Sequence, residues 1–447
     1  AFGGFVAIVT RSLSSGRAVT RTHVLVDEVI DLLGDAAAHQ RDDAVVLAVA
    51  SFLALEQLAD LLFHLLPLAV LDRLFEFGDQ RANGDCVDLA LQDLKAGLVE
   101  HPFDVLVLGV LAADADIDAV EAWDMFTGSD TVVVADLDTG VAVSHEDLAA
   151  NIWVNPGEIA GDGIDNDGNG FVDDINGYDF VNNDNDPDDD HGHGSHTVGT
   201  FGAVTGNSIG VASINWNLQV IAIKVANANG GLVTSDVVSA MDYLTTLKTQ
   251  HDVNIVAANA SYGGLGFSQA ESDSVQALTD AGILFVAAAG NGGFDVIGDD
   301  NDTAPFYPAS FNNDRIIAVA ATDHNDDRGA FSNFGLTSVD LGAPGVSILS
   351  TVPTSGAAAL GDPSGYNYSD GTSMAAPYVA GAVGFLAGYN PNATPDEIRQ
   401  AIFDGADPVT SLNGLTVTGG RLNLFNSATL LEPPAPPPPS PLPTPPI

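Results

Sequence analysis

The sequence predicts an α/β protein with a doubly wound, mostly parallel sheet and helices on both of its faces. From Thr131 onwards, short and almost continuously apolar runs alternate with segments whose apolar residues recur at helical spacing. Strands that are apolar along their whole length are typical of a parallel sheet that is covered on both faces. The predicted strands are residues 131–135, 220–225, 254–259, 283–288 and 316–320, and a predicted helix spans residues 235–247.

Composition divides the chain into three parts. Residues 1–112 hold 7 of the 13 basic residues but only 16 of the 60 acidic ones, and apolar residues spaced three and four apart at 24–33 and 88–98 predict a mainly helical segment. Residues 113–432 carry the strand and helix pattern described above. Residues 433–447 are mostly proline, which predicts an extended linker or tail beyond which a C-terminal module would attach.

Charge and composition exclude several classes of protein. The 447 residues include 13 Lys and Arg against 60 Asp and Glu, a formal charge of −47, so nucleic acid and anionic membrane surfaces are poor partners, and no nucleic-acid partner is expected. A hydrophobic fraction of 46% excludes a disordered acidic chain. The apolar stretch 44–71 is interrupted by Glu56, Asp60 and His64, which argues against a membrane span. The single Cys86 allows no internal disulfide.

One candidate nucleophile stands in the segment Asp-Gly-Thr-Ser-Met-Ala-Ala-Pro at 370–377, which leads into a small-residue helical run at 378–386. Ser373 would therefore lie at a helix N-terminus, where the peptide dipole favours negative charge and small neighbours admit a substrate backbone. The structural alternative is a plain helix N-cap, because serine and threonine are preferred caps.

A candidate base stands in the segment His-Gly-His-Gly-Ser-His at 191–196, which enters a second helical stretch at 197–201. Histidine is the natural general base near neutral pH. Two alternatives stay open: a histidine that only satisfies the helix start, and a zinc site built from His191, His193 and His196. Ser195 stands where the zinc hydrolases of similar pattern need an aspartate, which argues against zinc.

A candidate acid ends the first predicted strand. Catalytic groups in open parallel sheets collect at the carboxyl ends of the strands, which is where Asp138 falls, just before the turn at Gly140. A turn-capping aspartate is the alternative. An acid at a strand end, together with His193 and Ser373 at helix starts, is the combination needed to orient a base, deprotonate a hydroxyl group and attack.

Three motifs in this order, Asp138-Thr139-Gly140, His193-Gly194-Ser195-His196 and residues 371–377, resemble those of the subtilisin-like serine proteases, the subtilases of peptidase family S8. The resemblance runs from about residue 113 to residue 430, about 70% of the chain. It implies a subtilisin-like fold and an endopeptidase that works through an acyl-enzyme. Ser373 would be the nucleophile, His193 the general base and Asp138 the residue that orients it. Asn291, in Ala-Gly-Asn-Gly at 289–292, would donate to the oxyanion together with the N–H group of Ser373.

The resemblance also implies a substrate cleft with two walls. Ser261, Tyr262 and Gly263 match the strand edge that pairs with the substrate backbone, and the opposite wall matches Ala288, Ala289 and Gly290. Glycine permits a close backbone approach, and backbone pairing implies an extended protein or peptide substrate. His196 is interpreted as structural.

The N-terminal segment departs from the family pattern. Subtilases are normally made with a compact inhibitory α/β prodomain, which residues 1–112 do not resemble. A divergent prodomain, an unrelated helical module and a sequence read in the wrong frame all stay open for it. The chain starts at Ala1 without a basic region ahead of an apolar stretch, so a signal peptide is expected to have been removed or to be missing from this sequence.

An acidic segment predicts a calcium site. Between Asp162 and Asp190 there are 11 aspartates and neither lysine nor arginine, a density that repels itself unless cations bind. Residues 165–174 match the first half of an EF-hand loop, with alternating oxygen side chains and a glycine at the sixth position. Asn176 replaces the glutamate at the twelfth position, so the site must close differently; a solvated acidic loop is the alternative. The predicted ligands are Asp165, Asp167, Asn169, the carbonyl group of Phe171, and Asp173 or Asp174.

A second calcium site is implied by the resemblance alone. Residues 207–211 match the family's calcium loop, in which Asn207 and Asp147 would bind through side chains and Ile209 and Val211 through carbonyl groups. Calcium is the only cofactor expected, and no organic cofactor is predicted.

The sequence therefore predicts a calcium-stabilised serine endopeptidase, secreted or attached to the cell surface, that cleaves proteins or peptides and acts as a monomer. The competing class is a catalytically silent calcium-binding or adhesive module on the same fold, which the aspartate content and the proline-rich tail favour. Such a module has no need for an acid, a histidine, a serine and the amide of Asn291 to occur together.

Overall fold

The computed structural model describes residues 115–431, except 294 and 357, and residue 433. The predicted helical segment 1–112 and the tail after Pro433 lie outside these residues, so both stay predictions. The described chain contains a sheet of nine strands in the order β10-β11-β7-β6-β5-β4-β1-β3-β2. The strands are β1 (Gly128–Asp138), β2 (Gly177–Asp179), β3 (Asn217–Lys224), β4 (Ile255–Ala260), β5 (Leu284–Ala288), β6 (Ile316–Thr322), β7 (Leu341–Pro344), β10 (Asp407–Pro408) and β11 (Gly420–Arg421).

The sheet is parallel except at one edge. β1 pairs with β3 on one side and with β4 on the other, and the series continues in parallel through β5, β6, β7 and β11. Only the pair β10 and β11 is antiparallel within this sheet of the described residues. Every residue of β5 and β6 is buried, as the continuous apolar runs predict. The predicted mostly parallel sheet is confirmed.

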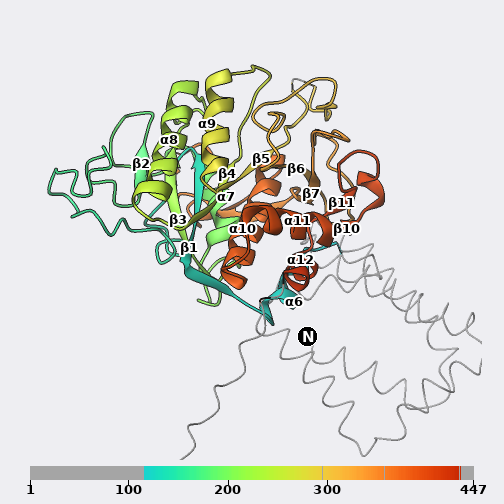
Figure 1. The fold of residues 1–447 in the computed structure, drawn as a ribbon, viewed down its shortest axis with the longest axis horizontal. Helices are drawn as coiled ribbons and strands as arrows, with labels where there is room; N and C mark the ends of the chain where they lie inside the picture. Colours follow the sequence, from blue (N-terminus) through green and yellow to red (C-terminus); the bar gives the residue numbers. More distant parts are fainter. Residues whose placement is uncertain (1–114, 294, 357, 432, 434–447) are drawn as a thin grey trace, which may run out of the picture. The chain divides into compact units, whose positions relative to one another are not determined.

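Helices cover both faces of the sheet (Figure 1). One face packs against α7 (His193–Gly202) and α10 (Thr372–Tyr389), and α6 (Ala119–Trp123), α11 (Pro395–Gly405) and α12 (Leu424–Leu430) extend the same core. The other face packs against α8 (Thr234–Gln250) and α9 (Gln269–Asp280). Strand β1 shows the alternation, since Val132 and Val134 belong to the first core and Val133 and Leu137 to the second. The doubly wound α/β prediction is confirmed.

The short strands were not predicted from the sequence. β2, β7, β10 and β11 hold two to four residues each, and β8 (Ile348–Thr351) pairs with β9 (Tyr366–Ser369) in a separate antiparallel hairpin. Segments this short carry too few residues for a periodic pattern, and their positions depend on the neighbours with which they pair.

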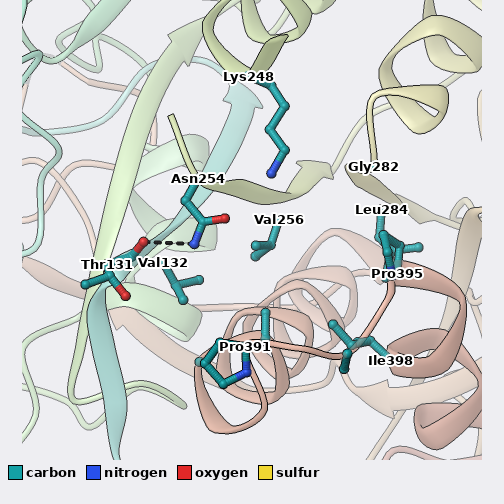
Figure 2. A pocket seen from close by; sticks show the side chains of 13 residues that line it. Thr131, Val132, Lys248, Asn254, Val256, Gly282, Leu284, Pro391, Pro395 and Ile398 are labelled. Atoms are coloured by element: carbon teal, nitrogen blue, oxygen red, sulfur yellow. Dashed lines mark hydrogen bonds between the residues drawn. The ribbon is translucent and has the colours of Figure 1, made fainter. Parts of the chain in front are cut away.

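A cavity of about 160 Å³ lies at the end of the sheet where β1, β4 and β5 begin. Lys248 of α8 extends into it, and Asn254 donates from Nδ2 to the carbonyl oxygen of Thr131 at its wall (Figure 2). None of the predicted site residues lines this cavity, because those residues follow the opposite, carboxyl ends of the strands. Among the described helices, none is both long and apolar enough to cross a bilayer.

Candidate active site

The acid and the histidine predicted from the sequence are in contact. Asp138 is the last residue of β1 and His193 the first residue of α7, and Nδ1 of His193 lies 2.7 and 2.9 Å from the two carboxylate oxygens of Asp138. Asp138 is 3% exposed and His193 is 23% exposed. Asp138 also accepts a hydrogen bond from the backbone N–H group of Thr139. The acid is thus buried, while the imidazole stays accessible.

Opposing effects set the pKa of His193. Burial lowers it, but the charge and hydrogen bond of Asp138, together with the charges of Asp136 and Asp189, raise it to about 9. A contact through Nδ1 leaves Nε2 as the nitrogen that can take a proton from a nucleophile.

Asp189 organises the turn that presents His193. Its carboxylate accepts from the backbone N–H groups of His191 and Gly192 and from the hydroxyl group of Thr139, and it accepts two further hydrogen bonds from Ser195. It is only 5% exposed. The first turn of α7 is therefore anchored by a buried carboxylate, a role that the acidic run 184–190 did not reveal in the sequence.

Ser373 is the second residue of α10, and Gly371 occupies the N-cap position. The Ser373 hydroxyl group donates to the carbonyl oxygen of Ser261 at 3.1 Å, and the Ser261 hydroxyl group donates back to the carbonyl oxygen of Ser373 at 2.9 Å. Ser373 thus does not cap the helix, which is the structural alternative that the sequence left open. Its hydroxyl group must turn away from Ser261 before it can donate to a base.

Asn291 lies beside the start of α10. Its Oδ1 atom accepts from the backbone N–H group of Thr372 at 2.9 Å and from the Thr372 hydroxyl group at 3.0 Å. These two bonds occupy the amide oxygen and leave Nδ2 free to donate to another partner, and Asn291 itself is exposed. Thr372 belongs to the motif at 370–377, but its residue type alone does not reveal that it holds Asn291.

Two further asparagine side chains support the segment that carries Asn291. Asn301 donates to the carbonyl oxygen of Ala289, and Asn333 accepts from the N–H group of Gly292 and donates to Asn301. Gly290 adopts φ +109°, and a Cβ atom there would come within 2.5 Å of Asn333. Ala288 and Ala289 are buried beside it. The wall predicted at 288–290 is thus a tightly supported turn. The resemblance did not indicate Asn301 and Asn333, which lie 12 positions after Ala289 and 41 positions after Gly292.

The opposite wall follows the end of β4. Ser261 contacts Ser373 as described, and Tyr262 and Gly263 continue toward a bridge between Gly264 and Tyr307. A Cβ atom on Gly263 would come within 2.3 Å of the Phe306 ring, so only glycine fits there. Strands β4 and β5 are neighbours, so both predicted walls flank the start of α10.

The three histidines of the 191–196 segment do not converge on a common point. Nε2 of His196 lies 3.0 and 3.1 Å from the carbonyl oxygens of Ile348 and Asn367, which ties α7 to the β8–β9 hairpin. Burial lowers the pKa of His196 to about 4, which keeps it neutral. His193 is committed to Asp138 through Nδ1. This geometry supports the structural interpretation of His196 and gives no support to the zinc alternative.

The acidic segment forms a cluster with one member that the sequence did not predict. Carboxylate oxygens of Glu158, Asp165 and Asp167 lie within 4.8 Å of one another. Asp165 accepts from the N–H groups of Gly168 and Gly170, which folds the loop back on itself. Glu158 precedes the loop by seven positions, so the loop pattern alone could not include it.

The other predicted ligands of this loop divide into two groups. Asp174 accepts from Asn169 and from the hydroxyl group of Tyr243, and burial raises its pKa to about 6. Asp173 instead accepts three backbone N–H groups from residues 161–163. Phe171 packs its ring against Tyr243. Asn169 also donates to Asp167, so Asn169 and Asp174 adjoin the cluster while Asp173 shapes the neighbouring turn.

The residues of the second predicted calcium site come together. Asp147 is fully buried, and its carboxylate accepts from Nδ2 of Asn207 at 2.7 Å and from the N–H group of Val211 at 3.0 Å. Oδ1 of Asn207 accepts from the N–H group of Ile209. The loop 207–211 thus folds around Asp147, and calcium binding by these residues stays a prediction.

A buried acid on an imidazole, a serine at a helix start and a side-chain amide beside that helix start are the groups that a serine hydrolase uses. A family model described as the subtilase family matches residues 129–424. The chain belongs to the subtilase family, and it is a serine-type endopeptidase.

Individual relatives agree with this. Thermitase from Thermoactinomyces vulgaris is 34% identical over 311 residues, which cover 70% of this chain and 93% of thermitase. The thermophilic serine proteinase of Bacillus sp. strain AK1 is 35% identical over 308 residues, 69% of this chain and 64% of that protein. A solved structure of a protease from Pseudoalteromonas arctica PAMC 21717 superposes with a TM-score of 0.56 at 27% identity, covering 72% of this chain and 96% of that one.

Proposed function

We propose that Asp138, His193 and Ser373 are the catalytic residues of this endopeptidase. The observation that carries the proposal is the contact of 2.7 Å between Nδ1 of His193 and Asp138, together with a serine at the start of α10, a helix that packs on the same face of the sheet as α7. Asp138 orients the imidazole, Nε2 of His193 takes the proton of Ser373, and the seryl oxygen attacks the carbonyl carbon of the scissile peptide. The protonated imidazole then donates to the leaving amine, and water repeats the sequence on the acyl-enzyme.

Asn291 stabilises the oxyanion in this proposal. Its Nδ2 group and the backbone N–H group of Ser373 would donate to the negative oxygen that develops during attack. The support is orientational, because Thr372 holds the amide oxygen and so directs the donor outward. Ser261, Tyr262 and Gly263 on one side and the 288–290 turn on the other would receive an extended protein or peptide segment.

The test is labelling with a fluorophosphonate probe, which reacts only with an activated serine. Wild type and Ser373→Ala are compared in the presence of calcium, and the adduct is mapped by mass spectrometry. Labelling at Ser373 that the variant lacks supports the proposal. A folded wild-type protein that is not labelled contradicts it and favours the catalytically silent calcium-binding or adhesive module.

We also propose that calcium stabilises the fold at two sites. No lysine or arginine of the described residues pairs with the three clustered carboxylates, and only His251 approaches Asp167, at 3.9 Å, so the carboxylates repel one another. A hard cation with oxygen ligands removes that repulsion. Asp165, Asp167 and the added Glu158 would form the first site, with Asn169, Phe171 and Asp174 adjoining it. Asp147, Asn207, Ile209 and Val211 would form the second. A bound ion would cross-link these loops and take no part in the reaction.

We further propose that the enzyme is secreted or attached to the cell surface and acts as a monomer. Secretion or surface attachment fits a calcium-dependent endopeptidase, because free calcium is abundant outside cells, and fractionation of the producing cells would test it. The monomeric state is tested by light scattering. Calcium binding is tested by equilibrium dialysis of the metal-free protein, with magnesium as the competing ion.

A further inference from the structure

Asp136 is a buried carboxyl group that the proposed reaction leaves unused. It lies two positions before Asp138 on β1, so both side chains point to the face of the sheet that α7 covers. Asp136 is 1% exposed, and no lysine or arginine of the described residues forms an ion pair with it. A buried carboxyl group without a cationic partner requires an explanation.

The neighbours of Asp136 supply a specific set of hydrogen bonds. The hydroxyl oxygen of Thr197, on α7, lies 3.1 and 3.0 Å from the two oxygens of Asp136 and 2.9 Å from the carbonyl oxygen of Gly194. On the other side, Asn259 of β4 donates from Nδ2 to Oδ1 of Asp136 at 2.8 Å. Thr197 and Asn259 are completely buried.

The number of donors and acceptors around Thr197 determines whether Asp136 carries a proton. The hydroxyl group of Thr197 has one hydrogen, yet two different acceptors surround it. If Asp136 is protonated, its Oδ2–H group donates to Thr197, Thr197 donates to the carbonyl group of Gly194, and Asn259 donates to Oδ1. Asp136 and Thr197 then each have their partners and no charge is buried, while Oδ1 of Asn259 is the one oxygen of these three side chains without a hydrogen bond. Burial, followed by the charge of Asp138, raises the pKa of Asp136, which agrees with the same state.

We propose that Asp136 is a positioning residue that stays protonated and, through Thr197, fixes the first turn of α7 against β1. Gly194 directly follows His193, and Asp138 lies on the same strand as Asp136, so the chain of hydrogen bonds spans the two elements whose contact forms the acid–base pair. The inference rests on the proposed catalytic role of His193.

The neutral state has a second effect. The charged groups that face Asp136 are Asp138 on β1 and His193 on α7, while Asp189 acts on His193 from the turn before it. A negative Asp136 would favour the protonated imidazole, in which form His193 cannot act as a base. A neutral Asp136 holds the helix turn without adding that charge.

The first test determines whether Asp136 is charged or protonated. Asp136→Asn keeps a donor for Thr197 and an acceptor for Asn259, so a neutral Asp136 predicts that the acid limb of kcat/KM moves by less than about 0.2 pH. If the midpoint of the acid limb falls by 0.5 pH unit or more, the variant has lost a negative charge, and the proposal is overturned. Infrared difference spectra of wild type against Asp136→Asn at pH 8 should show one protonated carboxyl band, and its absence also overturns the proposal.

The second test determines whether the Thr197 hydroxyl group helps to position α7 for the reaction. Thr197→Val keeps the shape and removes the hydroxyl group, and we expect kcat to fall about tenfold with little change in KM. Thr197→Ser should restore kcat to within about threefold of wild type. Thr200→Val is the matched control, because Thr200 is also buried on α7 but bonds only to the carbonyl oxygen of His196. A kcat of Thr197→Val equal to that of Thr200→Val overturns the positioning role.

The labelling of Ser373 and the infrared band of Asp136 test the proposed function and this inference separately. A wild-type protein that is not labelled at Ser373 contradicts the proposed function, while the infrared band still reports the protonation of Asp136. If Thr197→Val does not fold, the infrared comparison decides, because it needs only wild type and the isosteric Asp136→Asn.

Discussion

Thr372 and Asn291 are joined by two hydrogen bonds that end on a single oxygen atom. Oδ1 of Asn291 accepts both the N–H and the hydroxyl group of Thr372, and the same hydroxyl group accepts from the N–H group of Gly290. The residue before the nucleophile therefore determines the direction of the amide donor. The proposed oxyanion donor and the proposed nucleophile are thus linked through adjacent residues, because Thr372 and Ser373 are the first two residues of α10.

Replacing Asn291 should reduce turnover and leave binding intact. Asn291→Ala removes a donor that acts only when the oxyanion forms, so we expect kcat to fall by about 10²- to 10³-fold with KM nearly unchanged. That magnitude was measured for the corresponding loss in subtilisin itself and is borrowed here. Peptide hydrolysis under saturating and limiting substrate separates kcat from KM. Asn392→Ala, an exposed asparagine between α10 and α11, is the control.

The threonine that holds this amide should have a smaller effect. Thr372→Val keeps the backbone donor to Asn291 but removes the hydroxyl donor, so the amide is less well directed. We expect a loss of about tenfold in kcat, in the range that a displacement below 1 Å costs. Activity equal to wild type would show that the backbone bond alone holds Asn291.

Activity should rise with pH as His193 loses its proton. The folded-state pKa of His193 is raised from 6.5 to about 9, so the base is protonated and inactive below that value and becomes available as the pH rises through it. Asp136 is among the charges that raise it, and a neutral Asp136 contributes none. We therefore expect the midpoint of the acid limb of kcat/KM between 6.5 and 9. A midpoint below 6 would show that Asp138 does not stabilise the imidazolium.

Removal of calcium should destabilise the protein. A ligand at 100 times its dissociation constant stabilises the native state by about 2.7 kcal/mol per site, which corresponds to a shift in melting temperature on the order of 5 °C. A chelator should lower the melting temperature, and added calcium should restore it. Asp165→Asn and Asp167→Asn should weaken this response, whereas Asp242→Asn, on the exposed side of α8, should not. An unchanged melting temperature after chelation contradicts the proposed sites.

High salt should also stabilise the chain. A formal charge of −47 repels itself, and salt screens that repulsion. We expect the melting temperature at fixed calcium concentration to rise from low to molar sodium chloride. A flat or falling melting temperature would show that the charges are already compensated by bound ions.

The sequence determined the fold class because the sheet is buried. Strand β5 contacts α10 on one face and α9 on the other, so all of its residues are apolar, and this requirement is visible in the residues themselves. The sequence also determined the candidates Asp138, His193 and Ser373, since each follows a strand or begins a helix and each has a chemically specific side chain. The contact between Asp138 and His193 agrees with the rule that catalytic groups gather at the carboxyl ends of parallel strands.

Only the tertiary structure decided which residues support these groups. Asp136 reads as an ordinary residue of a strand until Thr197 and Asn259, 61 and 123 positions away, are placed beside it. Glu158 joins the acidic cluster, and Asn333 supports the turn at Gly292, through contacts between separate loops. Hydrogen bonds between distant segments leave no periodic signal in the sequence, because a polar residue has the same identity whether it meets water or a buried partner.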